Sequence, residues 1–460
     1  MPVAPAPAAG FPLEVETLVI GAGACGMVAA LSAHEAGQEV LVLERDPVPS
    51  GSTALSAGLI PAAGTAQQAA AGIEDSPALF AEDIRRKAHD EADPALVAAL
   101  THNAPRAIAW LTDTMGLPLT LVTDFDYPGH SRRRMHGLPD RSGAALVDAL
   151  RSLCEARDIP IVCERSAQTL CHDGRRITGV IAARPDGAEE AIGCTRLILA
   201  CNGYGGSRAR VARHMPGIAE ALYFGHSGNR GEALDWAEGL GLATAHLGAY
   251  QGHGNVAHPH GILITWATIT EGGVQVNREG RRFWNEAQGY SEAAQAVLSQ
   301  SGGEAVTIFD ARIAAIARQF EDFRQAEARG AIRQAETPRA LAEAFALPPA
   351  TVAQALAEAE AARAAGAPDV FGRSFGAVPP LAPPYCGVRV TGALFHTQGG
   401  IAISPEGRAL HADGTAMPNL FAAGGAAVGV SGSGDSGYLS GNGLLAAVVM
   451  GRIAGRQPLG

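Results

Sequence analysis

The sequence lacks the signatures of several broad protein classes. Its seven cysteines include no C-x-x-C pair, which argues against a zinc site or a c-type haem attachment. No apolar run approaches the ~20 residues needed to cross a bilayer, and no Lys/Arg block stands out in a chain of formal charge −11. We therefore expect neither a membrane span nor a nucleic-acid partner. The arginines at 132–134 are interpreted as a local solvated loop, with a loop that contacts an anion as the alternative.

The first residues, MPVAPAPAAGFPLEV, also lack the charged and apolar segments of a signal peptide. We expect a cytoplasmic protein with reduced thiols. Glycine, in contrast, is abundant, with 57 among 460 residues and no collagen period. So many glycines suit a backbone that approaches a large ligand at several points. The length predicts two or three domains.

The chain opens with the pattern of a βαβ unit. A predicted strand at 14–20 leads into G-x-G-x-x-G, formed by Gly21, Gly23 and Gly26, and a small-residue helix follows. The first glycine allows the tight turn, the second lets the backbone approach a pyrophosphate, and the third lets the helix pack on the strand. Glu44 ends the second strand, where it is placed to accept from a ribose hydroxyl. The position of the unit and the later glycine-rich loops favour FAD over NAD.

Several segments in order along the chain resemble the fumarate reductase/succinate dehydrogenase flavoprotein superfamily, which includes 3-ketosteroid dehydrogenases and tricarballylate dehydrogenase. They are GAGACG, SGSTALSAG, LILACNGYGG, VNREGRRFWNEA, FHTQGGI and NLFAAGGAA…GYLSGNGLL. The resemblance implies an α/β fold with a discontinuous Rossmann-type FAD-binding domain at 12–248 and 395–460. It also implies an inserted α+β capping domain at 249–394, with the active site between cap and isoalloxazine.

The same resemblance implies the residues that hold the cofactor. Ser52, Thr53 and Gly58 would line the pyrophosphate and flavin, and Ala167 would contact adenine through its backbone. Members with covalent FAD carry a His where this chain has Ser52, so noncovalent FAD is implied. Taken singly, each of the glycines also fits an ordinary turn. Further approaches to the cofactor are implied for Gly203, Gly424, Asn442 and Leu444.

Two arginines of the fumarate reductases are absent from this chain. The Arg that gives a proton to the substrate carbon corresponds to Tyr290, and the Arg that clamps a substrate carboxylate corresponds to Tyr438. The Glu and Arg of the family's proton relay correspond to Trp266 and Ile269. A phenol cannot offset the desolvation of a carboxylate as a bidentate guanidinium does, so fumarate and succinate become poor substrates. Tyr290 in its N-E-A-x-x-Y context is similar to 3-ketosteroid dehydrogenases, whereas GYLSGNG resembles tricarballylate dehydrogenase.

Other polar residues are candidates for contact with the substrate. His253 and His396 match the fumarate reductase pattern, and either could donate to a carbonyl or carboxylate oxygen. Tyr385 is either a core aromatic or a second phenol near the carbonyl. The spacing of His258 and His260 with His253 is metal-like, but no Cys or carboxylate partner is evident, so we expect no metal.

The expected reaction adds or removes two hydrogens across a C–C bond next to a carbonyl. Hydride passes between the β-carbon and flavin N5, and Tyr290 handles the α-proton. Desaturation of a ketone is favoured by the resemblance, and it needs a depressed tyrosine pKa, for which Arg281 or Arg282 could supply the cation. Reduction of an activated C=C bond and a flavin-binding protein without turnover are the alternatives. A small carbonyl or alkene substrate and a diffusible electron acceptor or donor are the expected partners.

Overall fold

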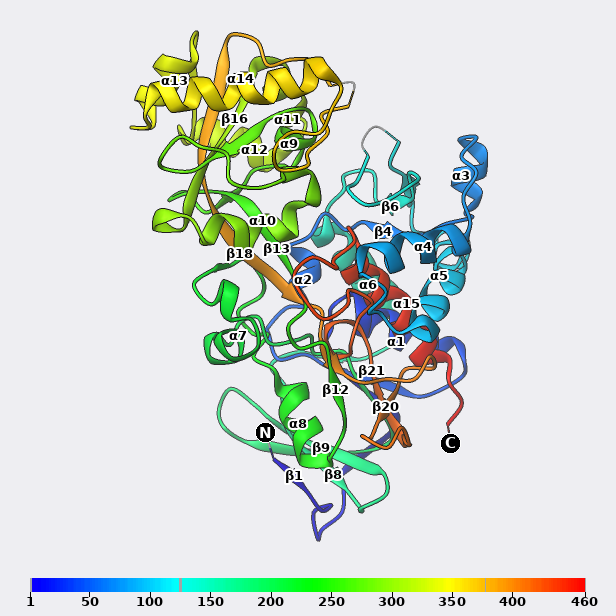
Figure 1. The fold of residues 1–460 in the computed structure, drawn as a ribbon. Helices are drawn as coiled ribbons and strands as arrows, with labels where there is room; N and C mark the ends of the chain where they lie inside the picture. Colours follow the sequence, from blue (N-terminus) through cyan, green and yellow to red (C-terminus); the bar gives the residue numbers. More distant parts are fainter. Residues whose placement is uncertain (1, 124–125, 377, 460) are drawn as a thin grey trace. The chain divides into compact units, whose positions relative to one another are not determined.

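The computed structural model describes residues 2–123, 126–376 and 378–459 (Figure 1). The chain divides into two compact units. The first unit comprises Met1–Arg210, Gly225–Tyr250 and His396–Gly460, and the second comprises Val211–Phe224 and Gln251–Phe395. The assignment of the segments 12–248, 249–394 and 395–460 to an FAD domain and a cap stays a prediction about function.

The first unit is built on a mixed sheet whose central strands are parallel. In register, Ile20 pairs with Leu43 and with Leu199, and Leu199 pairs with Ala422, so these strands end at one edge. Near this edge the longer strands are mostly apolar and buried, as strands covered on both faces must be. The parallel strands are β2 (Leu13–Ile20), β3 (Val40–Leu43), β7 (Ile161–Val162), β10 (Glu189–Leu199) and β21 (Ala416–Ala422).

Shorter strands extend this sheet and form two small ones. The hairpin of β8 (Ser166–His172) and β9 (Ile177–Ala183) pairs antiparallel with the first half of β10. The remaining strands of the unit are β1 (Val3–Ala4), β4 (Ile60–Pro61), β5 (Thr120–Leu121), β6 (Met135–Gly137), β12 (Thr244–Ala245), β19 (Gly400–Ile401) and β20 (Arg408–Leu410).

The helix that begins in the glycine motif packs closely against the last helix. Nearly every residue of α1 is buried, and most of them are small or apolar, as in a helix that has no solvent-facing side. A side chain at Gly451 would approach the carbonyl oxygen of Cys25 to 2.6 Å, so α15 requires glycine at this crossing. The helices of this unit are α1 (Ala24–Glu35), α2 (Gly51–Ala54), α3 (Ala66–Ala70), α4 (Pro77–Lys87), α5 (Pro94–Ala109), η1 (Trp110–Thr114), α6 (Gly143–Glu155), α8 (Glu232–Leu240), η5 (Gly424–Ala426) and α15 (Asn442–Arg456).

The second unit has its own sheet, with strand order β14-β13-β18-β16-β15. Every residue of β16 is buried, because alternate side chains enter two apolar clusters. One cluster includes α11 and α12, and the other includes α13 and α14 (Figure 1). The strands are β11 (Leu222–Tyr223), β13 (Tyr250–Ala257), β14 (Ile262–Leu263), β15 (Val274–Val276), β16 (Glu304–Asp310), β17 (Ile332–Ala335) and β18 (Tyr385–Thr397). The helices are α7 (Arg208–His214), which begins in the first unit, η2 (Pro216–Ile218), α9 (Ala267–Thr270), η3 (Glu286–Gln288), α10 (Tyr290–Leu298), η4 (Ser301–Gly303), α11 (Ala311–Ala317), α12 (Glu321–Ala328), α13 (Pro338–Ala344) and α14 (Pro349–Ala365).

One sequence-based expectation is corrected by the structure, and one helical stretch is divided. The Ala-rich stretch at 337–365 contains two helices, because Pro348 and Pro349 interrupt it and start α14. The arginine triplet is not a solvated loop throughout, because the side chain of Arg134 is fully buried and pairs with Asp75 at 2.9 Å and Asp83 at 2.6 Å. None of the helices in the described part of the chain has the length and apolar character of a membrane span. The expected α/β class with a Rossmann-type unit is confirmed.

Candidate active site

The aligned strand ends of the first unit gather four of the predicted cofactor residues. Gly21 follows β2, Glu44 follows β3, Gly203 lies just beyond β10, and Gly424 lies just beyond β21. Because these strands are parallel and in register, the four residues lie along one edge of the sheet. In open α/β sheets, ligands bind at the carboxyl edge.

The three motif glycines are required for different reasons. Gly21 has φ +101°, and a Cβ there would lie 2.6 Å from the carbonyl oxygen of Ala200. A Cβ on Gly26 would overlap the carbonyl oxygen of Gly21. Gly23 is different, because its φ of −75° suits any residue and its nearest protein neighbour would be Thr53 Oγ1 at 3.7 Å. Protein packing therefore leaves Gly23 unexplained, and the close approach of a pyrophosphate explains it. The site fits FAD.

Polar groups surround the start of α1. Glu44 is buried, and its carboxylate accepts from the backbone N–H groups of Ala22 at 2.7 Å and Asp46 at 2.9 Å. The hydroxyl of Thr53 accepts from the N–H of Ala24 at 3.2 Å. These bonds fix the turn that carries the glycines, and each carboxylate oxygen keeps a second lone pair for a ligand hydroxyl.

Ser52 is held by two amide side chains. Its hydroxyl oxygen accepts from Asn202 Nδ2 at 3.0 Å and from Asn229 Nδ2 at 2.9 Å. The hydroxyl hydrogen is then directed away from both amides and suits an anionic oxygen. Neither Asn202 nor Asn229 was predicted from the sequence, and only the N-G-Y-G-G turn after β10 gave a signal for the first of them.

The other predicted cofactor residues lie at close backbone crossings. Gly58 has φ +64°, and its Cβ would come within 2.9 Å of the Ser142 carbonyl oxygen. A Cβ on Gly203 would overlap the hydroxyl of Thr397. Ala167 is buried and is the second residue of β8.

The start of α15 offers one unsatisfied acceptor. Asn442 is the first residue of this helix and is 1% exposed. Its Oδ1 is buried and has no hydrogen-bond partner among the described residues. A buried acceptor without a donor is costly, so this atom fits an N–H or O–H of a bound group. Leu444 is half-buried two residues further along the helix.

An aromatic cluster in the second unit contains two of the predicted catalytic residues. The ring of His253, on β13, stacks on Tyr290, at the start of α10, with centroids 5.0 Å apart and planes 14° apart. Trp266 meets both rings edge-on, at 5.6 Å from His253 and 6.3 Å from Tyr290. Phe395 lies 5.7 Å from His253. Trp266 and Ile269 correspond to the charged relay of fumarate reductases, and here they pack with Tyr290 in an apolar cluster.

His253 is a neutral hydrogen-bond donor in this cluster. Burial lowers its pKa to about 3, so the ring carries no charge at pH 7. The backbone N–H of Asn255 donates to its Nδ1 at 3.2 Å. With Nδ1 accepting, the single ring proton lies on Nε2. This nitrogen suits a carbonyl oxygen.

A buried ion network leads into Tyr290. Glu286 is fully buried one turn before Tyr290 and pairs with Arg282 at 2.6 Å and Arg373 at 3.1 Å. Arg282 also pairs with Asp369 at 2.5 Å. The network therefore pairs two arginines, Arg282 and Arg373, with two carboxylates, Glu286 and Asp369. Arg281 is exposed, and its backbone N–H donates to Asn277. The sequence did not predict the network, although Glu286 belongs to the N-E-A segment.

The remaining predicted residues of the first unit form a second pair. The rings of His396 and Tyr438 meet edge-on with centroids 5.5 Å apart. Burial lowers the pKa of His396 to about 4. Burial also raises the pKa of Tyr438 to about 12, against the opposing effect of backbone amides at Gly441 and Gly443. At pH 7, this pair is an uncharged imidazole beside a protonated phenol.

Tyr385 does not join either pair. It begins β18 and packs in the apolar cluster of β15, β16, α13 and α14. Phe395, which contacts His253, lies ten residues further along the same strand, about 33 Å away at the usual rise of a strand. One small substrate cannot contact both Tyr385 and the His253 cluster, so Tyr385 has no part in the mechanism proposed below.

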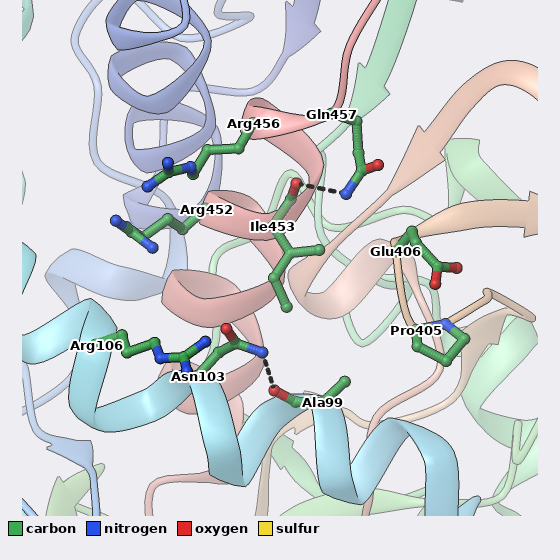
Figure 2. Close-up of a pocket in the computed structure, with 9 residues that line it drawn as sticks. All are labelled: Ala99, Asn103, Arg106, Pro405, Glu406, Arg452, Ile453, Arg456 and Gln457. Carbon is green, nitrogen blue, oxygen red and sulfur yellow. Dashed lines mark hydrogen bonds between the residues drawn. The ribbon is translucent and has the colours of Figure 1, made fainter.

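The predicted site residues form no metal site among the described residues, and they do not line a cleft that is present in the first unit. Among the described residues, no three His, Cys, Asp or Glu side chains are grouped to hold a metal, and all seven cysteines are free. A cleft of about 690 Å³ lies between α5, α15 and the turn before β20 (Figure 2). Two of its amide side chains donate to backbone oxygens within their own chain segments. The cleft is lined by Ala99, Asn103, Arg106, Pro405, Glu406, Arg452, Ile453, Arg456 and Gln457.

Curated relatives match almost the whole chain. A probable fumarate reductase Ifc3 of Shewanella frigidimarina is 29% identical, and the match covers 97% of this chain and 75% of that protein. An NADH:fumarate oxidoreductase of Klebsiella pneumoniae is 27% identical over 97% of this chain, which spans only 48% of that protein. A 4-oxocyclohexanecarboxylate 2-dehydrogenase of Sinomonas cyclohexanicum is 25% identical, with 97% and 93% covered.

Solved structures and a family model agree with these matches. The open form of a flavocytochrome c3 fumarate reductase superposes with TM-score 0.81 at 28% identity, covering 98% of this chain and 78% of that one. A 3-ketosteroid-Δ4-(5α)-dehydrogenase of Rhodococcus jostii RHA1 has TM-score 0.77 at 22% identity, with 99% of both chains covered, and so shares the fold. The model of the FAD binding domain family matches residues 16–444. The chain therefore belongs to the FAD binding domain family and is an FAD-dependent oxidoreductase similar to the fumarate reductases.

Proposed function

We propose that this enzyme desaturates a C–C bond next to the carbonyl of a small ketone or a similar neutral molecule. FAD, when bound, supplies the acceptor for the hydride of the β-carbon at flavin N5. Tyr290 takes the α-proton, and His253 or His396 donates to the carbonyl oxygen. The observation that carries the proposal is the Tyr290–His253 stack inside an apolar cluster.

The charge of the candidate residues supports a neutral substrate. Both positions at which fumarate reductases have arginines are phenols here, at Tyr290 and Tyr438. Burial keeps His253 and His396 uncharged at pH 7. A carboxylate would lose its hydration in exchange for neutral partners, which costs several kcal/mol more than for a carbonyl. A curated relative named 4-oxocyclohexanecarboxylate 2-dehydrogenase supports oxidation beside a ketone; the compound in that name also carries a carboxylate, so this relative does not support the neutral charge of the substrate.

The two kinds of residue have complementary roles. A donor to the carbonyl oxygen stabilises the negative charge that develops there when the α-proton leaves. That stabilisation acidifies the α C–H bond, so Tyr290 can take the proton once its own hydroxyl proton has passed to solvent. Tyr290 is half-buried against Trp266 and His253, and these contacts limit the positions that its ring can take. We propose that the segment 249–394 provides the substrate contacts, and that a diffusible acceptor reoxidises the flavin.

Reduction of an activated C=C bond is the second candidate, with Tyr290 as acid. The pairing of Arg282 with Glu286 and Asp369 favours it, because a cation already paired with carboxylates does less to stabilise a neighbouring phenolate. Relatives named fumarate reductase or fumarate oxidoreductase also point this way. In this direction a diffusible donor would supply the electrons.

An anaerobic flavin assay tests both directions. FAD-loaded protein is mixed with a panel of saturated cyclic and acyclic ketones, and loss of the visible flavin absorbance is followed. Photoreduced protein is mixed with the matching enones, and return of the absorbance is followed. Bleaching by ketones supports desaturation, whereas reoxidation by enones without bleaching by ketones supports reduction. If neither panel reacts, the protein binds flavin without this turnover, and the proposed function is wrong.

A further inference from the structure

A chain of buried polar side chains in the first unit ends on His396. Asn442 Nδ2 donates to Ser431 Oγ at 3.4 Å, and Ser431 Oγ donates to Gln398 Oε1 at 2.7 Å. Gln398 Nε2 then lies 2.9 Å from His396 Nδ1. Asn442, Ser431 and Gln398 are 1%, 1% and 6% exposed, so water does not compete for these bonds.

This row of hydrogen bonds determines the orientation of the Gln398 side-chain amide. Because Ser431 accepts from Asn442, its own hydroxyl hydrogen is available to Gln398 Oε1. The amide nitrogen faces the carbonyl oxygen of Thr397 at 3.5 Å. The reversed amide would put two carbonyl oxygens against each other and leave the Ser431 hydrogen without this acceptor. Gln398 therefore presents a donor to His396.

Two arrangements compete for the imidazole proton. Thr397 O lies 3.3 Å from His396 Nδ1 and could accept a proton from it. Gln398 Nε2, which is closer, can only donate to that nitrogen. One nitrogen cannot donate and accept at once, so the shorter bond excludes the longer one. The His396 ring is neutral because it is buried. A Cβ on Gly443 would lie 2.8 Å from its Nε2, so the ring lies next to the first turn of α15, which is the positive end of this helix.

We propose that Gln398 is a positioning residue that holds His396 in the tautomer with its proton on Nε2. His396 then donates at Nε2 and cannot serve there as a base. Its use of that proton on a substrate carbonyl rests on the proposed function, whereas the tautomer does not. A leucine at 398 would leave the Thr397 carbonyl as the partner of Nδ1, and the tautomer would reverse.

Nitrogen-15 NMR of histidine-labelled, FAD-loaded protein tests the tautomer directly. The signals of His396 are identified by their loss in His396→Asn. We expect the wild-type signals of an Nε2–H tautomer and those of an Nδ1–H tautomer in Gln398→Leu. Gln168→Leu, a change of the same kind at a half-buried position of β8, is the control and should leave the His396 signals unchanged. Wild-type protein with Nδ1–H, or Gln398→Leu with unaltered Nε2–H, overturns the proposal.

A second variant protects the test against misfolding of the first. Ser431→Ala releases the amide to turn, so a population of Nδ1–H should appear, and its absence would also overturn the proposal. On a ketone that bleaches the wild-type flavin, we expect Gln398→Leu to lower kcat roughly 10- to 100-fold with an unchanged flavin spectrum. A reversed tautomer with unchanged kcat would overturn the catalytic part alone. Failure of every ketone with the expected NMR result would count against the proposed function and not against the tautomer.

Discussion

Replacing the second and third motif glycines separately should divide ligand binding from folding. In Gly26→Ala, the new methyl overlaps the carbonyl oxygen of Gly21, so helix and strand must separate. We expect the free energy of unfolding to fall by about 3 kcal/mol or more. In Gly23→Ala, the methyl meets only Thr53 Oγ1 at 3.7 Å, an ordinary contact, and the backbone angles suit alanine. We expect a loss of about 1 kcal/mol or less, as for glycine to alanine at a helix N-cap.

The same substitution at Gly23 should weaken FAD binding strongly. The methyl occupies the space that we assign to the pyrophosphate, and overlap of one methyl with a packed group costs about 2 to 3 kcal/mol. That corresponds to roughly a 30- to 140-fold higher Kd. Apo-protein is prepared, FAD fluorescence quenching gives Kd, and urea unfolding of the apo-protein gives stability. A Gly23→Ala protein with wild-type Kd, or a Gly26→Ala apo-protein of wild-type stability, would refute the reasoning.

Three further outcomes follow from the structure. Tyr290→Phe should keep the flavin spectrum and lower kcat on an identified ketone by roughly 10²- to 10⁴-fold, as loss of a general acid or base does; unchanged kcat would remove Tyr290 from the mechanism. His253 takes up a proton near pH 6.5 when unfolded but only near pH 3 when folded, so stability should fall as pH drops through this window, and His253→Phe should flatten the plot of Tm against pH. Asp75→Asn removes one of the two carboxylates that pair with the buried Arg134 and leaves it paired with Asp83 alone, so the free energy of urea unfolding should fall by about 1 to 3 kcal/mol. Glu155→Gln breaks only an exposed ion pair and should change it by less than about 1 kcal/mol.

The front of the chain could be predicted because local signals agree there. Apolar strands, the glycine spacing and Glu44 all indicate one βαβ unit, and the structure contains it. The sheet of the second unit could not be predicted in the same way. Its longest strand, β18, pairs with β16 about eighty residues earlier, and such pairing leaves no local pattern. Pro348 and Pro349 are a local signal for the break between α13 and α14, but the Ala-rich composition of the whole stretch indicates continuous helix.

The candidate site shows the same division. Tyr290 and Tyr438 could be identified because each stands, within a segment that resembles the fumarate reductases, at the position of an arginine in those proteins. The partners of these residues could not be found in the sequence. Gln398, Ser431 and Asn442 meet across 44 positions, and Glu286 meets Arg373 across 87. Polar side chains become a network only when the fold excludes water from them, and that depends on packing rather than on spacing.

A direct comparison of the two substrate classes, neutral carbonyl compounds and dicarboxylates, tests the central claim of a neutral carbonyl substrate. FAD-loaded protein is mixed anaerobically in a stopped-flow instrument with a cyclic ketone or with succinate at equal concentration, and flavin bleaching is recorded. Photoreduced protein is mixed in the same way with the matching enone or with fumarate. The account predicts that the ketone or its enone exchanges electrons with the flavin and that succinate and fumarate do not. Exchange with fumarate or succinate at a rate equal to or above that of the neutral compounds would contradict it.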